Sequence, residues 1–195
     1  MARNIDGKTS TIHRTYLEPD GSGKARQIIE AGLDARKQYT APSSHPVNGC
    51  AIKLDIEEHP ALNAGEGLET MLGVRMLAPV PTWSLLNKTL LEQMEIPSYV
   101  KILTVWADRD RSGAGQESAV KLVERARAKG IRAIVMLPPF AIPDGEKGLD
   151  WNDVVRDHGI EVMRRNMKFL EWKRRLMQIL AEIRNQSPRQ LSAVS

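Results

Sequence analysis

One stretch constrains the fold of this chain more than any other: residues 100–115, which read VKILTVWADRDRSGAG. Its first half is an apolar, β-rich run that predicts a buried strand, and its second half turns through glycines into a helix. Asp108 and Asp110 follow the predicted strand two positions apart, so in an extended chain both side chains point to the same side. Ligands of open α/β sheets bind at the carboxyl ends of the strands. Because two close carboxylates repel each other unless a cation or proton lies between them, we expect a hard divalent ion such as Mg²⁺ here.

The segments around this stretch alternate between strand and helix patterns. Short apolar runs that end at glycine or proline predict strands, and apolar positions that recur at helical spacing predict helices. The alternation across residues 60–155 predicts an α/β fold with a mostly parallel sheet of about four strands flanked by helices. We expect strands within 61–67, 82–86, 101–107 and 131–137, the last of them buried, and helices within 68–77, 90–94 and 112–129 and from 150 onward.

The N-terminal part has a different pattern. Residues 8–17 are rich in Thr, Ile and Tyr and predict a strand, which a hairpin-type turn at Asp20 follows. Residues 25–49 are mostly polar and predict an irregular connector, and residues 50–54 predict a further strand. We therefore expect a small β appendage over 1–57, an α/β domain over 58–159 and a C-terminal segment over 160–195.

The C-terminal segment predicts one long basic helix from Ile160 to about Arg184. Its wide apolar stripe, which includes Met163 and Leu170, is typical of packing on a core, with an adaptable methionine-rich contact surface as the alternative. Residues 161–190 hold eight Lys or Arg against three Glu, whereas the whole chain has a net charge of +4. Such a basic segment suits a polyanion such as nucleic acid, and a solvated helix face is the plainer alternative.

Several classes of protein are excluded by composition. The single cysteine, Cys50, excludes an internal disulfide framework and a multi-cysteine zinc site, so we expect no zinc. No apolar run approaches the roughly 20 residues of a membrane helix. The first ten residues, MARNIDGKTS, lack the apolar core of a signal peptide. We therefore expect a cytoplasmic protein without a membrane partner.

Three acidic clusters lie at predicted strand ends or in the loops after them. They are Glu66 in AGEGLE, Asp108 with Asp110 in ADRDRSG, and Asp150 with Asp153 in GLDWNDVV. The carboxyl ends of parallel strands share one edge of a sheet, so the three clusters can meet in space. Taken singly, an acid at a strand end is usually a turn former or a helix cap. Three clusters in this order, each near glycine, favour a shared metal site.

These motifs carry a family resemblance. Together they resemble the toprim domain, a Rossmann-like catalytic fold of bacterial-type primases, topoisomerases and some nucleases. The stretches that carry the resemblance are, in order, NAGEGLETML, VWADRDRSGAGQESA, MLPP and GLDWNDVV. The EGLET sequence, the D-x-D followed by SGAG, and the D-W-N-D box resemble in particular the toprim primases of phages, plasmids and mobile elements. The leading HRTYLEPDGSGKA is similar to the segment that precedes toprim in those proteins, so the resemblance covers roughly residues 10–160.

The resemblance implies a DNA primase that joins nucleotides into an RNA primer on a single-stranded DNA template. Glu66 matches the family's glutamate, to which a general acid/base or metal-positioning role is assigned. Asp108 and Asp110 match the metal-binding pair, and Asp150 and Asp153 match the distal acidic box that helps to hold metal. The implied cofactor is Mg²⁺ or Mn²⁺. Joining nucleotides puts charge on a phosphoryl group, which a cation is suited to neutralise.

Basic residues and glycines near the motifs are candidates for contact with phosphate. Gly113 lets backbone approach a phosphate at the start of a helix. Arg109 stands between the two aspartates, where mobile-element proteins often have a small polar residue, and is expected to pair with the carboxylates or to reach a phosphate. The full set of candidate phosphate or nucleic-acid contacts is Arg109, Arg111, Gly113, Lys121, Arg164, Arg165, Lys173 and Arg174.

The chain also departs from the family pattern. Thr70 stands four positions after Glu66, where the cellular primases have an acid, and Glu69 is a possible substitute. Primases of this kind usually bring a cysteine-rich zinc module to hold template, and often a helicase. With one cysteine, the chain resembles a toprim portion alone. Template binding is then expected to fall to the basic tail or to a partner such as a helicase or a zinc-ribbon protein.

Two other functions remain open. One is a toprim nuclease that cleaves DNA phosphodiesters. The other is a non-catalytic nucleic-acid-binding module that keeps the fold, against which the intact Glu66, Asp108 and Asp110 argue. A topoisomerase would need a tyrosine nucleophile from another domain, because no tyrosine of this sequence lies in a motif that indicates a nucleophile.

Overall fold

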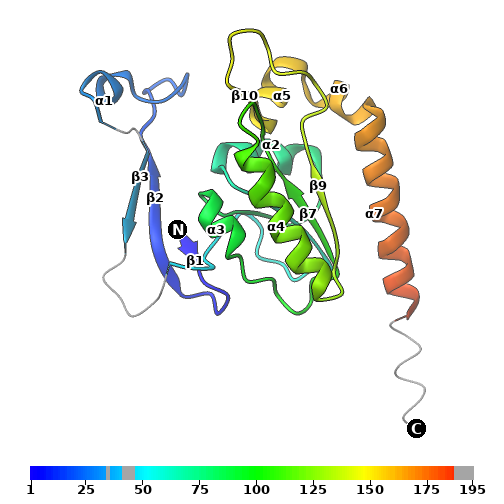
Figure 1. Ribbon diagram of the computed structural model, residues 1–195. Helices are drawn as coiled ribbons and strands as arrows, with labels where there is room; N and C mark the ends of the chain where they lie inside the picture. The colour runs from blue at the N-terminus through cyan, green and yellow to red at the C-terminus, as the bar shows by residue number, and fades with distance from the viewer. Residues whose placement is uncertain (34–35, 41–46, 187–195) are drawn as a thin grey trace.

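A five-stranded sheet forms the centre of the computed structural model, which describes residues 1–33, 36–40 and 47–186 (Figure 1). Four of its strands run parallel, and β4 adds an antiparallel strand at the edge beside β6. The predicted α/β fold with a mostly parallel sheet is therefore confirmed. Across the sheet the strands are β4 (Ile52–Lys53), β6 (Thr82–Ser84), β5 (Ala61–Gly65), β7 (Ile102–Trp106) and β9 (Arg132–Met136).

Helices cover both faces of this sheet. Leu62 and Leu103 belong to one core cluster together with apolar residues of α3 and α4. Ala61 and Trp106 point to the opposite face and belong to a second cluster with residues of α2, α5, α6 and α7. The alternation along β5 and β7 is the two-residue period of a strand buried on both faces. The helices concerned are α2 (Leu68–Leu77), α3 (Lys88–Glu92), α4 (Ala114–Ala128), α5 (Trp151–His158), α6 (Ile160–Arg165) and α7 (Met167–Gln186).

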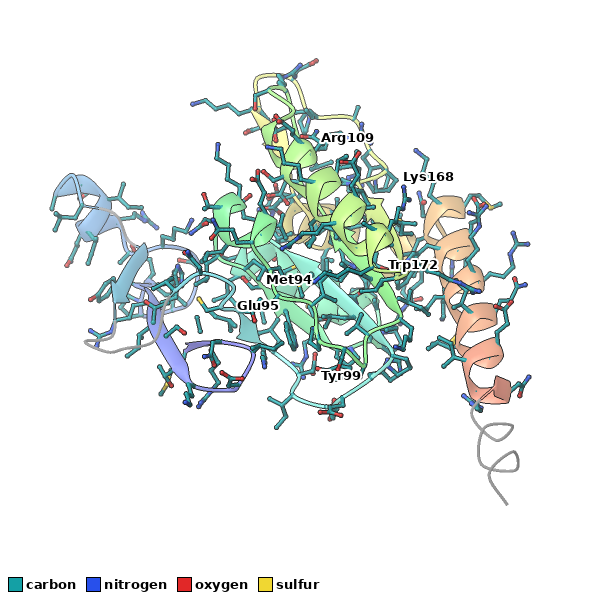
Figure 2. The ribbon with its side chains drawn as sticks, turned by 60° about the horizontal axis from the view of Figure 1, so that its bottom comes forward. Met94, Glu95, Tyr99, Arg109, Lys168 and Trp172 are labelled. Carbon is teal, nitrogen blue, oxygen red and sulfur yellow. The ribbon has the colours of Figure 1, made fainter. Side chains whose placement is uncertain are left out.

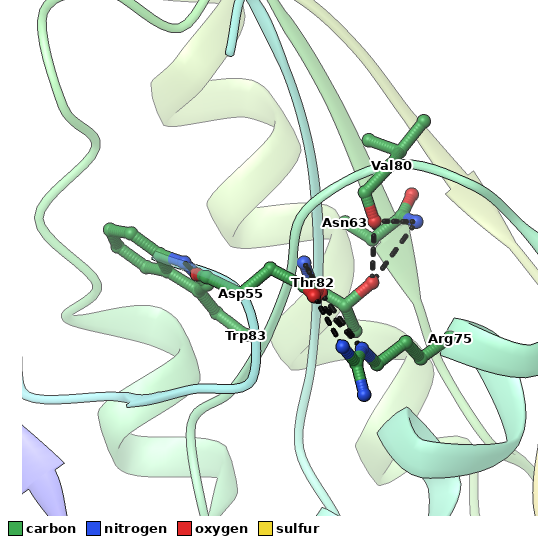
Figure 3. Close-up of polar contacts among 6 residues, drawn as sticks. All are labelled: Asp55, Asn63, Arg75, Val80, Thr82 and Trp83. Carbon is green, nitrogen blue, oxygen red and sulfur yellow. Dashed lines mark hydrogen bonds and ion pairs between the residues drawn. The ribbon is translucent and has the colours of Figure 1, made fainter. Parts of the chain in front are cut away.

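A buried polar network holds the register of the sheet (Figure 3). Asn63, at the middle of β5, is fully buried and accepts a hydrogen bond from the indole N–H of Trp106 at 2.9 Å. Its amide N–H donates to Thr82 on the neighbouring strand at 3.4 Å. Beside this network, at the surface, Asp55 pairs with the exposed guanidinium of Arg75 at 2.7 Å. Because a one-residue slip would leave the buried groups of Asn63, Thr82 and Trp106 unpaired, the network favours a single alignment of the strands.

The N-terminal segment forms a small antiparallel sheet beside the main body, with strand order β1-β2-β3 (Figure 1). The strand expected over 8–17 is confirmed as β2, and a bridge between Leu17 and Lys24 closes the expected turn. The connector expected over 25–49 was predicted as mostly irregular, and its described part contains a short helix and a short strand that pairs with β2. These elements are β1 (Ala2–Arg3), β2 (Thr9–Thr15), α1 (Arg26–Glu30) and β3 (Arg36–Thr40).

The strand expected over 50–54 is present as β4, but its pairing partner is a strand of the main sheet. Ile52 and Lys53 pair with Ser84 and Trp83 of β6. The backbone of Ala51 exchanges hydrogen bonds with Arg3 of β1 at 2.8 and 2.9 Å. This segment therefore links the small N-terminal sheet to the edge of the central sheet.

The single helix expected from Ile160 onward is instead two helices, α6 and α7. Asn166 interrupts them with an extended backbone (φ −66°, ψ 131°). Its side-chain oxygen accepts hydrogen bonds from the backbone N–H groups of Lys168 and Phe169 at 3.0 and 3.4 Å. Asparagine competes in this way for the backbone groups that a continuous helix would use. None of the helices in the described ranges is long and apolar enough to cross a bilayer.

Helix α7 packs on the sheet as expected, but partly through other residues than the predicted stripe, because Leu170 is exposed. Phe169, Trp172 and Leu176 are buried in the core cluster of that face. The indole N–H of Trp172 donates to the hydroxyl of Thr104 on β7 at 3.0 Å, and Figure 2 labels Trp172 between α7 and the sheet. The neighbouring strand β9 lies at the edge of the sheet and is only partly covered, with Ile134 39% exposed. The expectation that this strand is buried is therefore wrong.

Candidate active site

Side chains from all three acidic clusters line one pocket at the carboxyl edge of β5 and β7. The pocket has a volume of about 420 Å³. Parallel strands bring it together, because Gly65 at the end of β5 lies beside Trp106 at the end of β7. The lining residues are Glu66, Lys88, Asp108, Asp110, Gly115, Lys147, Gly148, Leu149, Asp150 and Asp153.

Asp108 is the electrostatic centre of the pocket. It follows β7 and accepts a hydrogen bond from the hydroxyl of Thr70 at 3.4 Å. Burial, followed by the charges of Asp150, Glu66 and Asp110, raises the pKa of Asp108 from its ordinary 3.8 to about 7. A carboxyl group therefore gives up its proton here only at the cost of repulsion from its neighbours. Thr70, four positions after Glu66, contributes a hydrogen bond to this group.

Asp110 lies on a short strand that the sequence pattern did not indicate. Strand β8 (Arg109–Asp110) pairs antiparallel with β10 (Gly148–Leu149). The carboxylate of Asp110 accepts from the hydroxyl of Ser112 at 2.6 Å and from the backbone N–H of Gly115 at 3.0 Å. It is therefore held against the first turn of α4, where the positive end of the helix dipole favours an anion.

Glu66 is placed by a close approach of backbones at the end of β5. A Cβ atom on Gly65 would contact Met71 and would lie only 2.7 Å from the carbonyl oxygen of Trp106, so this position requires glycine. The backbone carbonyl of Glu66 accepts a hydrogen bond from the hydroxyl of Ser84 at 3.0 Å. The start of the loop is thus tied to both neighbouring strands, which directs Glu66 to the pocket.

Asp150 and Asp153 form a capping box at the start of α5. Asp150 accepts from the backbone N–H of Asp153 at 2.7 Å, and Asp153 accepts from the N–H of Asp150 at 3.2 Å. Burial raises the pKa of Asp150. Asp153 also pairs with Arg156 at 2.9 Å. Helix capping and pocket lining are therefore compatible for Asp150, whose cap hydrogen bond from Asp153 uses Oδ1, whereas the cap and Arg156 engage both oxygens of Asp153.

The donor set suits a hard divalent cation. All five acidic groups of the pocket offer oxygen ligands, which Mg²⁺ and Mn²⁺ prefer. Burial, and then the charges of the neighbouring carboxylates, raise the pKa of Asp108, and a bound cation would offset both effects. Within the described ranges, no three of the His, Cys, Asp and Glu side chains converge closely enough to form a ready-made metal cluster. The side chains therefore have the donor atoms that such an ion prefers, but they are not already arranged as a complete set of metal ligands.

The toprim domain family matches residues 61–161, just over half of the chain and the whole of the pocket lining. The chain belongs to the toprim family. No curated protein matches it in sequence.

Solved structures of primases share the toprim fold of this chain. A DNA primase domain from Pseudomonas aeruginosa has a TM-score of 0.52 and 13% identity over 83% of this chain and 47% of its own length. A structure of the DnaG catalytic core has a TM-score of 0.52 and 17% identity, over 82% and 48%. A DnaG primase catalytic domain bound to single-stranded DNA has a TM-score of 0.53 and 17% identity, over 85% and 49%. The chain thus spans about half the length of these proteins and shares their fold.

Two candidate phosphate contacts of the toprim domain are engaged elsewhere. Arg109 donates from two nitrogens to the carbonyl oxygen of Pro138, at 2.8 and 3.0 Å (Figure 2). Arg111 donates to the carbonyl oxygens of Glu146 and Pro143 at 3.0 and 3.4 Å. Both arginines therefore fasten the loop between β9 and β10 to β8. The expected pairing of Arg109 with the aspartates is replaced by this attachment.

The other candidate contacts lie outside the pocket lining, although Gly113 caps α4 with φ +76°. Lys121 pairs with Glu92 and Glu117 at 3.3 and 3.2 Å. Arg164 pairs with Glu161 at 2.7 Å. The remaining basic candidates are exposed on α6 and α7, namely Arg165, Lys173 and Arg174.

Sequence reasoning missed two lysines and one tryptophan of this toprim site. Lys88 and Lys147 line the pocket. Trp151 is fully buried, and its indole N–H donates to the carbonyl oxygen of Ala107 at 3.2 Å. A signal was available for Lys147 and Trp151, because both lie within three residues of Asp150. Lys88 follows a polar helix cap and had no such signal.

Proposed function

We propose that this chain is the catalytic toprim portion of a DNA primase. In this proposal it is an Mg²⁺- or Mn²⁺-dependent nucleotidyltransferase that joins ribonucleotides on a single-stranded DNA template. The observation that carries the proposal is the pocket in which Asp108, whose pKa is raised to about 7, lies together with four other carboxyl groups from three separate motifs. Residues with shifted pKa values in a pocket are typical of catalytic sites.

Asp108, Asp110 and Asp150, with Asp153 beside them, would hold the metal. When bound, the metal would neutralise charge that develops on the phosphoryl group during transfer. Thr70 holds one oxygen of Asp108, and Ser112 with Gly115 hold the carboxylate of Asp110, so neither group swings freely. Such orientation of the ligands before substrate arrives lowers the cost of reaching the reacting geometry.

Glu66 is proposed as the acid/base group that receives the proton of the attacking 3′-hydroxyl. Its side chain lines the pocket opposite the aspartates, and its charge acts on Asp108. A general base must lie within hydrogen-bond reach of the proton it takes, which a position in the same pocket permits.

The template is proposed to be held by the exposed basic residues of α6 and α7 or by a partner, such as a helicase or a zinc-ribbon protein. One solved relative is described as bound to single-stranded DNA, and this chain covers about half of that protein. In this proposal a separate partner would supply the contacts to template that this chain does not make itself.

The test combines the protein with single-stranded DNA, ribonucleotides and either Mg²⁺ or Mn²⁺. Primer synthesis that is lost in Asp108→Asn would support the proposal. The matched control is Asp157→Asn, which removes an exposed carboxylate that is paired with Arg156 outside the pocket. Nicking of DNA without nucleotides would indicate a nuclease instead. DNA binding without either activity, unchanged by Glu66→Gln, would indicate a non-catalytic module.

A further inference from the structure

Two lysines line the same pocket as the carboxylates. Lys88 is the first residue of α3, and Lys147 immediately precedes β10. Both line the same pocket as the five acids, although they come from opposite ends of the domain's sequence. Neither takes part in any ion pair found within the described part of the chain. The two ammonium groups are therefore available to an anion that enters the pocket.

A constrained turn places Lys88. Leu86 has φ +66° and is the one non-glycine residue with a positive φ in the described ranges. Its backbone N–H donates to the hydroxyl of Ser84 at 3.4 Å, and the same hydroxyl donates to the carbonyl of Glu66. Asn87 then caps α3 by accepting from Leu90 at 2.9 Å. Strained backbone of this kind persists where surrounding contacts enforce it, and it recurs at binding sites.

Lys147 is held by the strand that carries Asp110. Its carbonyl oxygen accepts a hydrogen bond from the backbone N–H of Arg111 at 3.1 Å. The next residue, Gly148, pairs directly with Asp110 in the two-stranded ladder. The guanidinium of Arg111 holds the preceding carbonyl, that of Glu146, at 3.0 Å. Arg111 is therefore a positioning residue for Lys147, which explains why its own charge is directed away from the pocket.

We infer that Lys88 and Lys147 bind the polyphosphate chain of the incoming nucleotide, an inference that rests on the proposed function. A lysine is a point charge that suits phosphate oxygens, and it would add positive charge to that of a metal held by the carboxylates. The pocket volume of about 420 Å³ suits a small ligand. A DNA strand is typically tracked by an open basic groove. The two lysines thus supply the positive charge that an otherwise acidic pocket needs to admit a triphosphate.

The test measures binding without turnover. Calorimetric titrations with ATP, GTP and inorganic tripolyphosphate, each with Mg²⁺, compare the wild type with Lys88→Gln, Lys147→Gln and the double variant. Each single change is expected to weaken triphosphate affinity about tenfold, the effect of one lost charge-assisted hydrogen bond. Lys147→Arg, which keeps the charge, is expected to restore part of the loss. The control is Lys129→Gln, an exposed lysine at the far end of α4.

A parallel titration with single-stranded DNA separates the two sources of phosphate. Affinity for DNA is expected to stay within about twofold in the lysine variants, since the phosphates of a strand lie outside the pocket in this assignment. An equal loss for DNA and triphosphate would overturn the assignment, as would unchanged triphosphate affinity in the double variant. Wild type that binds no triphosphate would also overturn it. Primer synthesis is scored separately, so lysine-dependent triphosphate binding without synthesis would reject the proposed function alone.

Discussion

The indole N–H of Trp151 donates a hydrogen bond to the carbonyl oxygen of Ala107, 3.2 Å away. Ala107 immediately precedes Asp108, and Trp151 immediately follows Asp150. One buried hydrogen bond therefore ties together the two acidic motifs that come from the end of β7 and the start of α5. The ring of Trp151 also packs edge-on against Trp106, with 4.6 Å between ring centroids.

We predict that Trp151→Phe lowers stability by about 2 kcal/mol, through the lost hydrogen bond and reduced packing. It should also lower metal affinity and primer synthesis, because Asp150 loses its anchor to β7. Urea unfolding and Mg²⁺ titration measure the two effects. Trp83→Phe is the matched control, since Trp83 also donates to a backbone carbonyl, that of Asp55 at 3.2 Å, outside the pocket. Equal losses of metal affinity in both variants would contradict the prediction.

The stability of the metal-free protein should depend on the pKa of Asp108. Its folded-state pKa is raised from 3.8 to about 7, so the folded chain holds this proton more tightly than the unfolded chain. Between pH 4 and 7 the unfolded state loses the proton first, and the contribution of Asp108 to stability falls as pH rises. The penalty at pH 8 is on the order of 1–2 kcal/mol once solvent screening is allowed for.

Two measurements check this pH dependence. Mg²⁺ should raise the melting temperature more at pH 8 than at pH 5, because only the ionised pocket attracts the cation. Asp108→Asn should stabilise the metal-free protein at pH 8 and should remove most of the response to Mg²⁺. A variant that is less stable than the wild type at pH 8 without metal would show that repulsion at Asp108 is not significant.

Gly65 should tolerate no side chain. A Cβ atom there would lie 2.7 Å from the backbone oxygen of Trp106, and backbone cannot move aside as a flexible side chain can. We predict that Gly65→Ala costs at least about 2 kcal/mol and displaces Glu66. Gly23→Ala is the control, because no atom lies within 4 Å of a Cβ at that position. Chemical denaturation of both variants would refute the prediction if their stabilities agreed.

We predict that Arg109 stabilises the loop between β9 and β10 and does not bind nucleic acid. Arg109→Ala removes the two hydrogen bonds to the carbonyl of Pro138. Amide hydrogen exchange in residues 138–147 should become faster, while affinity for single-stranded DNA should change by less than about twofold. Arg165→Ala, which removes an exposed arginine of α6, should leave exchange in the loop unchanged. A large loss of DNA affinity in Arg109→Ala alone would restore the expected role in phosphate binding.

Most elements between residues 61 and 158 follow from local pattern, because apolar periodicity and glycine or proline stops act over a few residues. The short strands β8 and β10 are the exceptions, since they form by pairing with each other across the sequence. Strands were harder to predict where the strand that pairs with them lies far away in the sequence. The polar residues of β3 carry little apolar signal, and the strand forms because β2 is available to it. The exposure of β9 depends on its place at the sheet edge, which no local pattern specifies. The break at Asn166 depends on one side chain bonding to backbone instead of to solvent.

The sequence by itself determined which acids gather at the pocket. Glu66, Asp108 and Asp150 follow strands or begin a helix, and parallel strands necessarily bring their carboxyl ends to one edge. Only the tertiary structure decided which cations face those acids. A long basic side chain turns to whichever acceptor the folded loops bring near, so Arg109 and Arg111 are directed to backbone carbonyls of the loop before β10. The same loop closure, together with the turn before α3, leaves two lysines to line the pocket.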